Sequence, residues 1–130
     1  MQIVTRKFAG TALVGVVGRV DHRSAAELEQ ALAAVMTQAN LAHSGVVLDF
    51  AGVEYISSVG LRVLMVAAKQ MRANAAPLAI AALQPVVAEI FAISRFDRVL
   101  AVHPDVPAAL AQCSAAALAA WRAAPHKPSS

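Results

Sequence analysis

Two neighbouring hydroxyl groups and a glycine could carry chemistry in this chain: Ser57, Ser58 and Gly60, within Tyr55-Ile56-Ser57-Ser58-Val59-Gly60-Leu61-Arg62. The stretch joins an apolar run to a segment with helical periodicity, so the serines stand at the start of a predicted helix. One interpretation is structural: Ser57 or Ser58 is an N-cap that accepts a hydrogen bond from a free backbone N–H, and Gly60 permits close packing. Another is a nucleophilic serine, and a third makes the hydroxyl the substrate of another protein.

The catalytic interpretation needs a strained turn and a base. The nucleophile elbow has the pattern G-x-S-x-G, but the β-branched Ile56 occupies the first glycine position when Ser58 is placed at the centre. The candidate bases stand in no supporting motif; they are His22, His43, His103 and His126. The sequence therefore predicts no catalytic residue, and we expect that the protein is not an enzyme.

Metal and cofactor sites are not predicted either. The histidines and acidic residues show no metal-ligand spacing, and neither standard glycine-rich phosphate loop occurs. A single cysteine, Cys113, excludes an intrachain disulfide. Its alanine-rich surroundings favour a small packed thiol over a nucleophile.

The composition indicates one packed domain. The 130 residues are 58% hydrophobic and 15% charged, which suits a single core. The net charge is +3, but the basic residues are scattered and aromatic residues make up 5%, so we expect no direct nucleic-acid binding. No run of about 18 strongly apolar residues occurs, and Arg19-Val20-Asp21-His22-Arg23 stands where a signal peptide would carry its small-residue cleavage site. We therefore expect a cytoplasmic protein without membrane insertion.

Periodicity and turn residues predict an α/β fold: a single domain with a mostly parallel sheet of about five strands and about four helices. The first two strands form a hairpin, and a capping box of Ser24 and Glu27 begins the first helix. The predicted strands are 2–8, 12–18, 46–50, 78–83 and 98–102; the predicted helices are 24–39, 58–73, 85–94 and 105–122. The domain is expected to span 1–122, and the tail 123–130 is expected to be disordered.

The predicted connections place the serines at one edge of the sheet. Residues 40–45 form a polar loop, and residues 51–57 connect the third strand to the second helix. Functional sites in open α/β sheets gather beyond the carboxyl ends of parallel strands, where residues 51–60 are expected. The core stripe of the second helix is predicted to be Leu61, Leu64, Met65, Ala68 and Met71, with Arg62, Lys69 and Arg72 facing solvent.

The segment VVLDFAGVEYISSVGLRVL, residues 46–64, resembles the signature of the STAS domain family, specifically the bacterial anti-sigma factor antagonists. Gly18-Arg19-Val20-Asp21 resembles the family's turn after the second strand, and residues 83–98 resemble its third helix and exit. The resemblance covers about residues 2–112 and implies a small partner-switching protein. Its implied partner is an anti-sigma factor that is a serine kinase. That kinase phosphorylates a serine at the start of the second helix, phosphorylation ends the complex, and a serine phosphatase acts on the phosphorylated form.

Carried over by position, the phosphoacceptor is Ser58, two residues before Gly60, and Ser57 is the alternative acceptor. Many members have Asp-Ser-Ser-Gly there, so Ser57 replaces the aspartate and Val59 replaces a serine or alanine. Asp21 matches a recurrent acidic position near the partner-facing edge, although it also suits a turn at a helix entry. The partner-binding residues implied by the resemblance are Asp21, Ser57, Ser58, Val59, Gly60 and Arg62.

A second functional hypothesis keeps the STAS fold without the switch. The chain would then be a constitutive binding module in a lipid-transport or sensory complex, and would use the same edge of the sheet. The two hypotheses differ in whether a charge at Ser58 changes binding.

Overall fold

The sheet has five strands in the order β1-β2-β3-β4-β5. The computed structural model of the chain describes residues 1–42 and 44–124, without the side chains of residues 40–42. The strands are β1 (Gln2–Phe8), β2 (Thr11–Val20), β3 (Val46–Ile56), β4 (Leu78–Ala81) and β5 (Ala101–His103). The helices are α1 (Ala25–Ala42), α2 (Ser58–Ala73), α3 (Pro85–Ile93), α4 (Val106–Cys113) and α5 (Ala115–Ala123), with a 3₁₀ turn over Phe96–Arg98.

The predicted mostly parallel α/β architecture is confirmed. The hairpin of β1 and β2 is antiparallel, and the pairs β2–β3, β3–β4 and β4–β5 are parallel. Ala9 and Gly10 turn the hairpin with positive φ angles of 50° and 88°, as a two-residue hairpin loop requires. Because β2 and β3 run in parallel, the turns that follow them lie at the same edge of the sheet.

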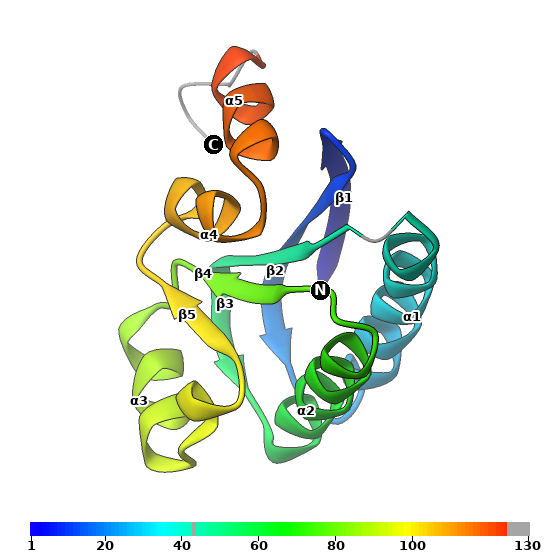
Figure 1. Ribbon diagram of the computed structural model, residues 1–130. Coiled ribbons are helices and arrows are strands. Elements are labelled where there is room, and N and C mark those ends of the chain that lie inside the picture. Colours follow the sequence, from blue (N-terminus) through cyan, green and yellow to red (C-terminus); the bar gives the residue numbers. More distant parts are fainter. Residues whose placement is uncertain (43, 125–130) are drawn as a thin grey trace.

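The core has two parts, one on each face of the sheet. The larger part includes Leu28 and Leu32 of α1 and Leu64 and Met71 of α2, packed against one face of β2 and β3. The smaller part lies under α4 and α5 on the other face and contains Val47 and several alanines. Figure 1 shows α1 and α2 together on one side of the sheet and α4 on the other. The run at 46–50 is therefore covered on both faces, as a central parallel strand should be.

Two predicted boundaries and one predicted helix cap were wrong in the first half of the chain. The expected connection 51–57 is largely strand, because β3 continues to Ile56 while it pairs with the long β2 through bulges near Gly15 and Gly18. Helix α1 extends to Ala42, so the loop predicted at 40–45 is shorter. The hydroxyl of Ser24 bonds to Arg19 and Asp21, and not forward to Glu27 as in a capping box.

The second half of the chain also corrects the prediction. The strand predicted at 78–83 ends at Ala81, because Ala82 has a φ of 63°. The strand predicted at 98–102 is a 3₁₀ turn followed by β5 at 101–103. The helix predicted at 105–122 is two helices, so the chain has five helices in its described part. It breaks at Ser114, whose extended backbone (φ −168°, ψ 128°) caps α5 through a bond from Ala117 N to Ser114 Oγ.

The core stripe of α2 was partly wrong. Leu64, Ala68 and Met71 are buried as expected, and Leu61 is partly buried, but Met65 is 36% exposed. Val63 and Ala67 take its place in the core. The predicted solvent face is confirmed, since Arg62, Lys69 and Arg72 are all exposed.

Candidate functional site

The turn from β3 into α2 gives the two serines different environments. Ser57 is the N-cap of α2, with extended backbone angles (φ −85°, ψ 171°), and is only 6% exposed. Its Oγ accepts a hydrogen bond from Gly60 N at 3.2 Å. Its backbone N–H donates to Val20 O at 2.8 Å. Ser57 therefore satisfies one free N–H of the helix, and its hydroxyl oxygen already accepts that hydrogen bond.

Ser58 is the first residue of α2 and is exposed. Its hydroxyl makes no hydrogen bond with any residue that the structure describes. No acidic residue occupies the first turn of α2, so no carboxylate of that turn offsets the positive end of the helix dipole or its free N–H groups. An anionic group on Ser58 would therefore meet a favourable local field.

Gly60 lets the first turn of α2 lie directly on the sheet. A Cβ atom at this position would lie 2.7 Å from Val20 Cγ1 and 2.8 Å from Ile56 Cγ1. Both distances are shorter than carbon atoms tolerate without displacement. The glycine is therefore needed for close packing, and it fixes the distance of the Ser58 backbone from the ends of β2 and β3.

Asp21 closes the neighbouring turn, between β2 and α1. Its Oδ1 accepts hydrogen bonds from Arg23 N at 3.0 Å and Ser24 N at 3.1 Å. The Ser24 hydroxyl also donates to it at 3.2 Å. The pKa of Asp21 is lowered from its ordinary value of 3.8, chiefly by the bond from the Ser24 backbone and further by Arg23 N–H and the nearby Arg19 charge. These bonds give Asp21 a structural role in the turn.

The implied partner-binding residues occupy adjoining positions. Ser57 N is bonded to Val20 O, the carbonyl directly before Asp21, so the two turns lie side by side. Val59 is partly buried against the core, whereas Arg62 is exposed one turn further along α2. The surface part of this group is thus Ser58 and Arg62, with part of Asp21 and Val59. Ser57 and Gly60 lie beneath that surface and support it.

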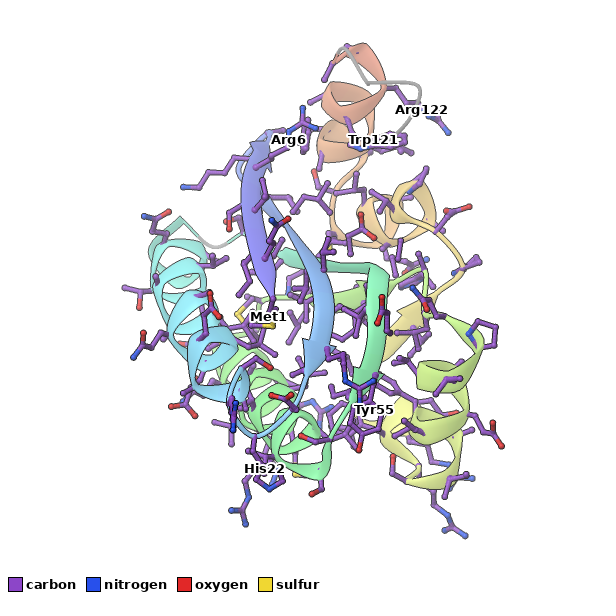
Figure 2. All side chains as sticks on the ribbon, turned by 180° about the vertical axis from the view of Figure 1, so that it is seen from behind. Met1, Arg6, His22, Tyr55, Trp121 and Arg122 are labelled. Atoms are coloured by element: carbon purple, nitrogen blue, oxygen red, sulfur yellow. The ribbon has the colours of Figure 1, made fainter. Side chains whose placement is uncertain are left out.

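An Arg–Tyr pair at this edge was missed by sequence analysis. The Arg19 guanidinium carbon lies 4.6 Å from the centre of the Tyr55 ring, a distance at which a cation–π attraction operates. The two residues face each other across the β2–β3 register. Figure 2 shows Tyr55 and His22 at the same end of the molecule, far from Arg6, Trp121 and Arg122. Only the register could reveal the pair, since 36 positions separate them in the sequence.

The other chemical groups do not gather around the serines. His22 is exposed and His103 lines a cavity beside β4 and β5; His43 and His126 lie outside the described residues. No group of three potential metal ligands occurs among the described residues. Burial raises the pKa of the Cys113 thiol to about 11, so it is a protonated, packed thiol at neutral pH. None of the described helices is both long and apolar enough to cross a membrane.

The chain matches the family model described as "Mlab, STAS domain" over residues 4–102. It is also 37% identical over 111 residues to a Bordetella bronchiseptica protein named "Putative anti-sigma factor antagonist BtrV". That alignment covers 85% of this chain and 93% of the relative. The matched family region includes both turns of the site, whereas α4 and α5 lie beyond it.

Solved structures share the fold. The crystal structure of an anti-sigma factor antagonist from Mycobacterium paratuberculosis superposes with a TM-score of 0.74 at 25% identity, covering 86% of this chain and 92% of that one. The Bacillus cell fate determinant SpoIIAA in its phosphorylated form superposes with a TM-score of 0.58 at 12% identity, covering 78% of this chain and 90% of that one. At that identity the second likeness concerns the fold alone.

Proposed function

The chain belongs to the STAS domain family, and on that premise we propose that it is an anti-sigma factor antagonist switched by phosphorylation at Ser58. The unphosphorylated form binds an anti-sigma factor of the serine-kinase type. That kinase transfers a phosphoryl group from ATP to Ser58, and the complex then dissociates. A serine phosphatase restores the binding form. In this cycle the protein is a regulator and a substrate, and it supplies no catalytic group.

The observation that carries the proposal is the difference in burial and hydrogen bonding between Ser57 and Ser58. The Ser57 hydroxyl is buried and accepts the bond from Gly60 N, so a kinase would have to dismantle the cap to reach it. The Ser58 hydroxyl is exposed at a helix terminus whose backbone is held by that cap. This contrast favours Ser58 over Ser57 as the phosphoacceptor.

The physical consequence of phosphorylation falls on the interface rather than on the fold. A phosphate adds about −1.5 to −2 charges at neutral pH. The N-terminus of α2 accommodates that charge, because its first turn carries no acidic residue. A partner surface that fits a neutral hydroxyl must instead desolvate a doubly charged group. The domain therefore stays folded while the complex dissociates.

The exposed neighbours of Ser58 give the partner a mixed surface. Arg62 lies one turn along α2, and the pair of Arg19 and Tyr55 lies at the ends of β2 and β3. Asp21 contributes a carboxylate that stays ionised because its pKa is lowered. A partner that recognises this edge thus meets cations, the Asp21 carboxylate and an aromatic ring around the acceptor hydroxyl.

The test is to incubate the wild type, Ser57→Ala and Ser58→Ala with a kinase-type anti-sigma factor and ATP. The modified residue is then mapped by mass spectrometry. We expect one phosphate on Ser58 in the wild type and in Ser57→Ala, and none in Ser58→Ala. Phosphate at neither serine would refute the switch. Phosphate on Ser57 in the wild type would refute the choice of acceptor.

A partner-capture assay with the wild type and Ser58→Asp distinguishes the switched antagonist from a non-switching STAS module. A constitutive STAS module would capture its partner equally well as the wild type and as Ser58→Asp. A switched antagonist would lose its partner in the Ser58→Asp form. Equal capture would therefore contradict the proposal even if a kinase could label Ser58 in vitro.

A further inference from the structure

A cavity of about 500 Å³ lies at the opposite end of α2 from Ser58. Its walls come from the last turns of α2, the starts of β4 and β5, and the end of α4. Arg72 follows Ser58 by 14 positions, which places it roughly 21 Å further along the helix axis. The cavity is therefore separate from the phosphorylation surface, although one helix contributes to both.

The floor of the cavity is apolar and its space comes from small side chains. Leu78 and Leu100 supply larger apolar surface, together with Pro77 in the turn before β4. The rest of the apolar lining consists of small side chains; these are Ala68, Ala75, Ala76, Ala79 and Ala101. A volume of this size falls in the range of small-molecule sites, about 300–1,000 Å³.

The polar groups of the lining are cationic or neutral. Arg72, His103 and Gln112 contribute to the walls, and no aspartate or glutamate does. Nη2 of Arg72 donates to Val99 O at 3.0 Å, which holds the guanidinium in place and leaves further N–H donors available. His103 Nε2 is buried and has no hydrogen-bond partner among the described residues. Arg72 therefore brings to the lining a positive charge that no described acidic residue of the lining neutralises, together with unused guanidinium N–H donors.

We propose that this cavity binds a single-chain amphiphile with a carboxylate head, with Arg72 at the carboxylate and the alanine-lined floor along the alkyl chain. Guanidinium–carboxylate pairs are strong and directional, and an alkyl chain gains free energy when apolar surface leaves water. A metal ion does not fit, because His103 and Cys113 have no third ligand among the described residues.

The test uses octanoate as the probe and octan-1-ol as its uncharged counterpart. Amide chemical shifts of the full chain are followed by NMR during titration. We expect saturable shifts at residues 75–79, 99–103 and 112–113, and weaker binding of octan-1-ol. Arg72→Met should weaken octanoate binding at least about tenfold, whereas Lys69→Met, an exposed cation that does not line the cavity, should not.

A second variant guards against misfolding of Arg72→Met. Ala101→Leu places a larger side chain at an exposed position of β5 that lines the cavity, and should abolish binding without unfolding the chain. Octanoate should also slow the reaction of Cys113, the only cysteine of the chain, with an aromatic disulfide reagent. Ser58→Asp should bind octanoate as the wild type does, so this site and the switch are tested separately.

Three results would overturn the proposal. One is an unsaturable or dispersed pattern of shifts, which indicates adsorption to the surface. Another is equal affinity of the wild type and Arg72→Met for octanoate, or of octanoate and octan-1-ol for the wild type. The third is flotation with phosphatidylglycerol vesicles without binding of free octanoate, because the chain would then recognise a lipid surface and not a single free amphiphile.

Discussion

Helix α2 is built differently at its two ends. At its N-terminus Ser57 caps the helix, and Gly60 brings the first turn so close to Val20 and Ile56 that no Cβ fits between them. At its C-terminus the helix ends at Ala73 with Asn74 as its C-cap, and Ala75 turns with a φ of 55°. A cavity of about 500 Å³ opens there beside Arg72. We call the N-terminal end of α2, with Ser57, Ser58 and Gly60, the tight end, and its C-terminal end beside Arg72 the hollow end. The tight end exposes one hydroxyl on a closely packed backbone, and the hollow end borders the cavity.

This difference separates two ways of sensing. A hydroxyl on a tightly packed helix terminus can receive a covalent charge while the fold stays unchanged, so the change appears only at the surface that a partner contacts. A cavity binds a ligand by burying it, so the hollow end would respond to the presence of a small molecule. If the two ends of α2 act independently, substitutions at one end should leave binding at the other end unchanged.

The largest effect is expected at the tight end, from Ser58→Asp. The added charge must be desolvated against the partner, and a penalty of about 3–4 kcal/mol would weaken the complex a few hundred-fold. The melting temperature should change little, because the first turn of α2 carries no other acid. Affinity by calorimetry and thermal melting measure the two quantities. Gln70→Glu, an exposed neutral-to-acidic change at the far end of α2, is the control and should keep its partner.

Gly60→Ala should be the most destabilising single change at the tight end. The new methyl group would overlap the side chains of Val20 and Ile56, and overpacking of this kind costs typically about 1–3 kcal/mol. Chemical denaturation measures the free energy of unfolding. Gly15→Ala is the matched control, because its Cβ would meet only the Val4 carbonyl oxygen at 3.7 Å. Equal losses in both variants would show that the first turn of α2 is not tightly packed.

The two serines should differ in stability as well as in phosphorylation. Ser57→Ala removes the N-cap bond to Gly60 N and should lower the free energy of unfolding by about 1 kcal/mol. Ser58→Ala removes an exposed hydroxyl that bonds to no described residue, and should stay within about 0.5 kcal/mol of the wild type. Urea unfolding of both variants provides the measurement. A larger loss for Ser58→Ala would contradict the assignment of the cap.

The sequence predicted the tight end better than the hollow end, for physical reasons. The start of α2 at Ser58 was predicted correctly, because capping hydroxyls and helical periodicity are local features. The choice between Ser57 and Ser58 as the cap could not be made locally. In the structure Ser57 is the cap, and its N–H also donates to Val20 O at the end of β2, a residue far away in the sequence.

The structure of the hollow end was not predicted correctly, because it is built from short strands and helices with little hydrophobic periodicity. Residues 98–102 looked like a strand, yet Arg95 turns with a φ of 58° and the strand begins only at Ala101. The helix at 105–122 looked continuous because alanine favours helix throughout, but Ser114 ends one helix and caps the next. Arg72 was correctly predicted to be exposed, and its contact with Val99 O depends on tertiary packing alone.

Acid should act on the tight end through Asp21. Its folded-state pKa lies below the ordinary value of 3.8, so its ionised form stabilises the fold above that pH, and this stabilisation is lost as the pH falls through the lowered folded pKa. Asp21→Asn keeps an oxygen acceptor for Arg23 N and Ser24 N but cannot titrate. Acid unfolding followed by circular dichroism should therefore be steeper in the wild type below about pH 4. Superimposable acid limbs would show that the charge of Asp21 does not support the turn.

Alkali should act on the hollow end through Cys113. The thiol pKa is raised by burial from 9.0 to about 11, so the folded state keeps the proton that the unfolded chain releases. Stability is therefore fully present below pH 9 and is lost as the pH rises toward 11. The difference in unfolding free energy between the wild type and Cys113→Ser, measured across that window, isolates the contribution of this thiol, because all other groups are common to both chains. Parallel curves would mean that water reaches the thiol freely, and the hollow end would then be an open surface rather than a cavity.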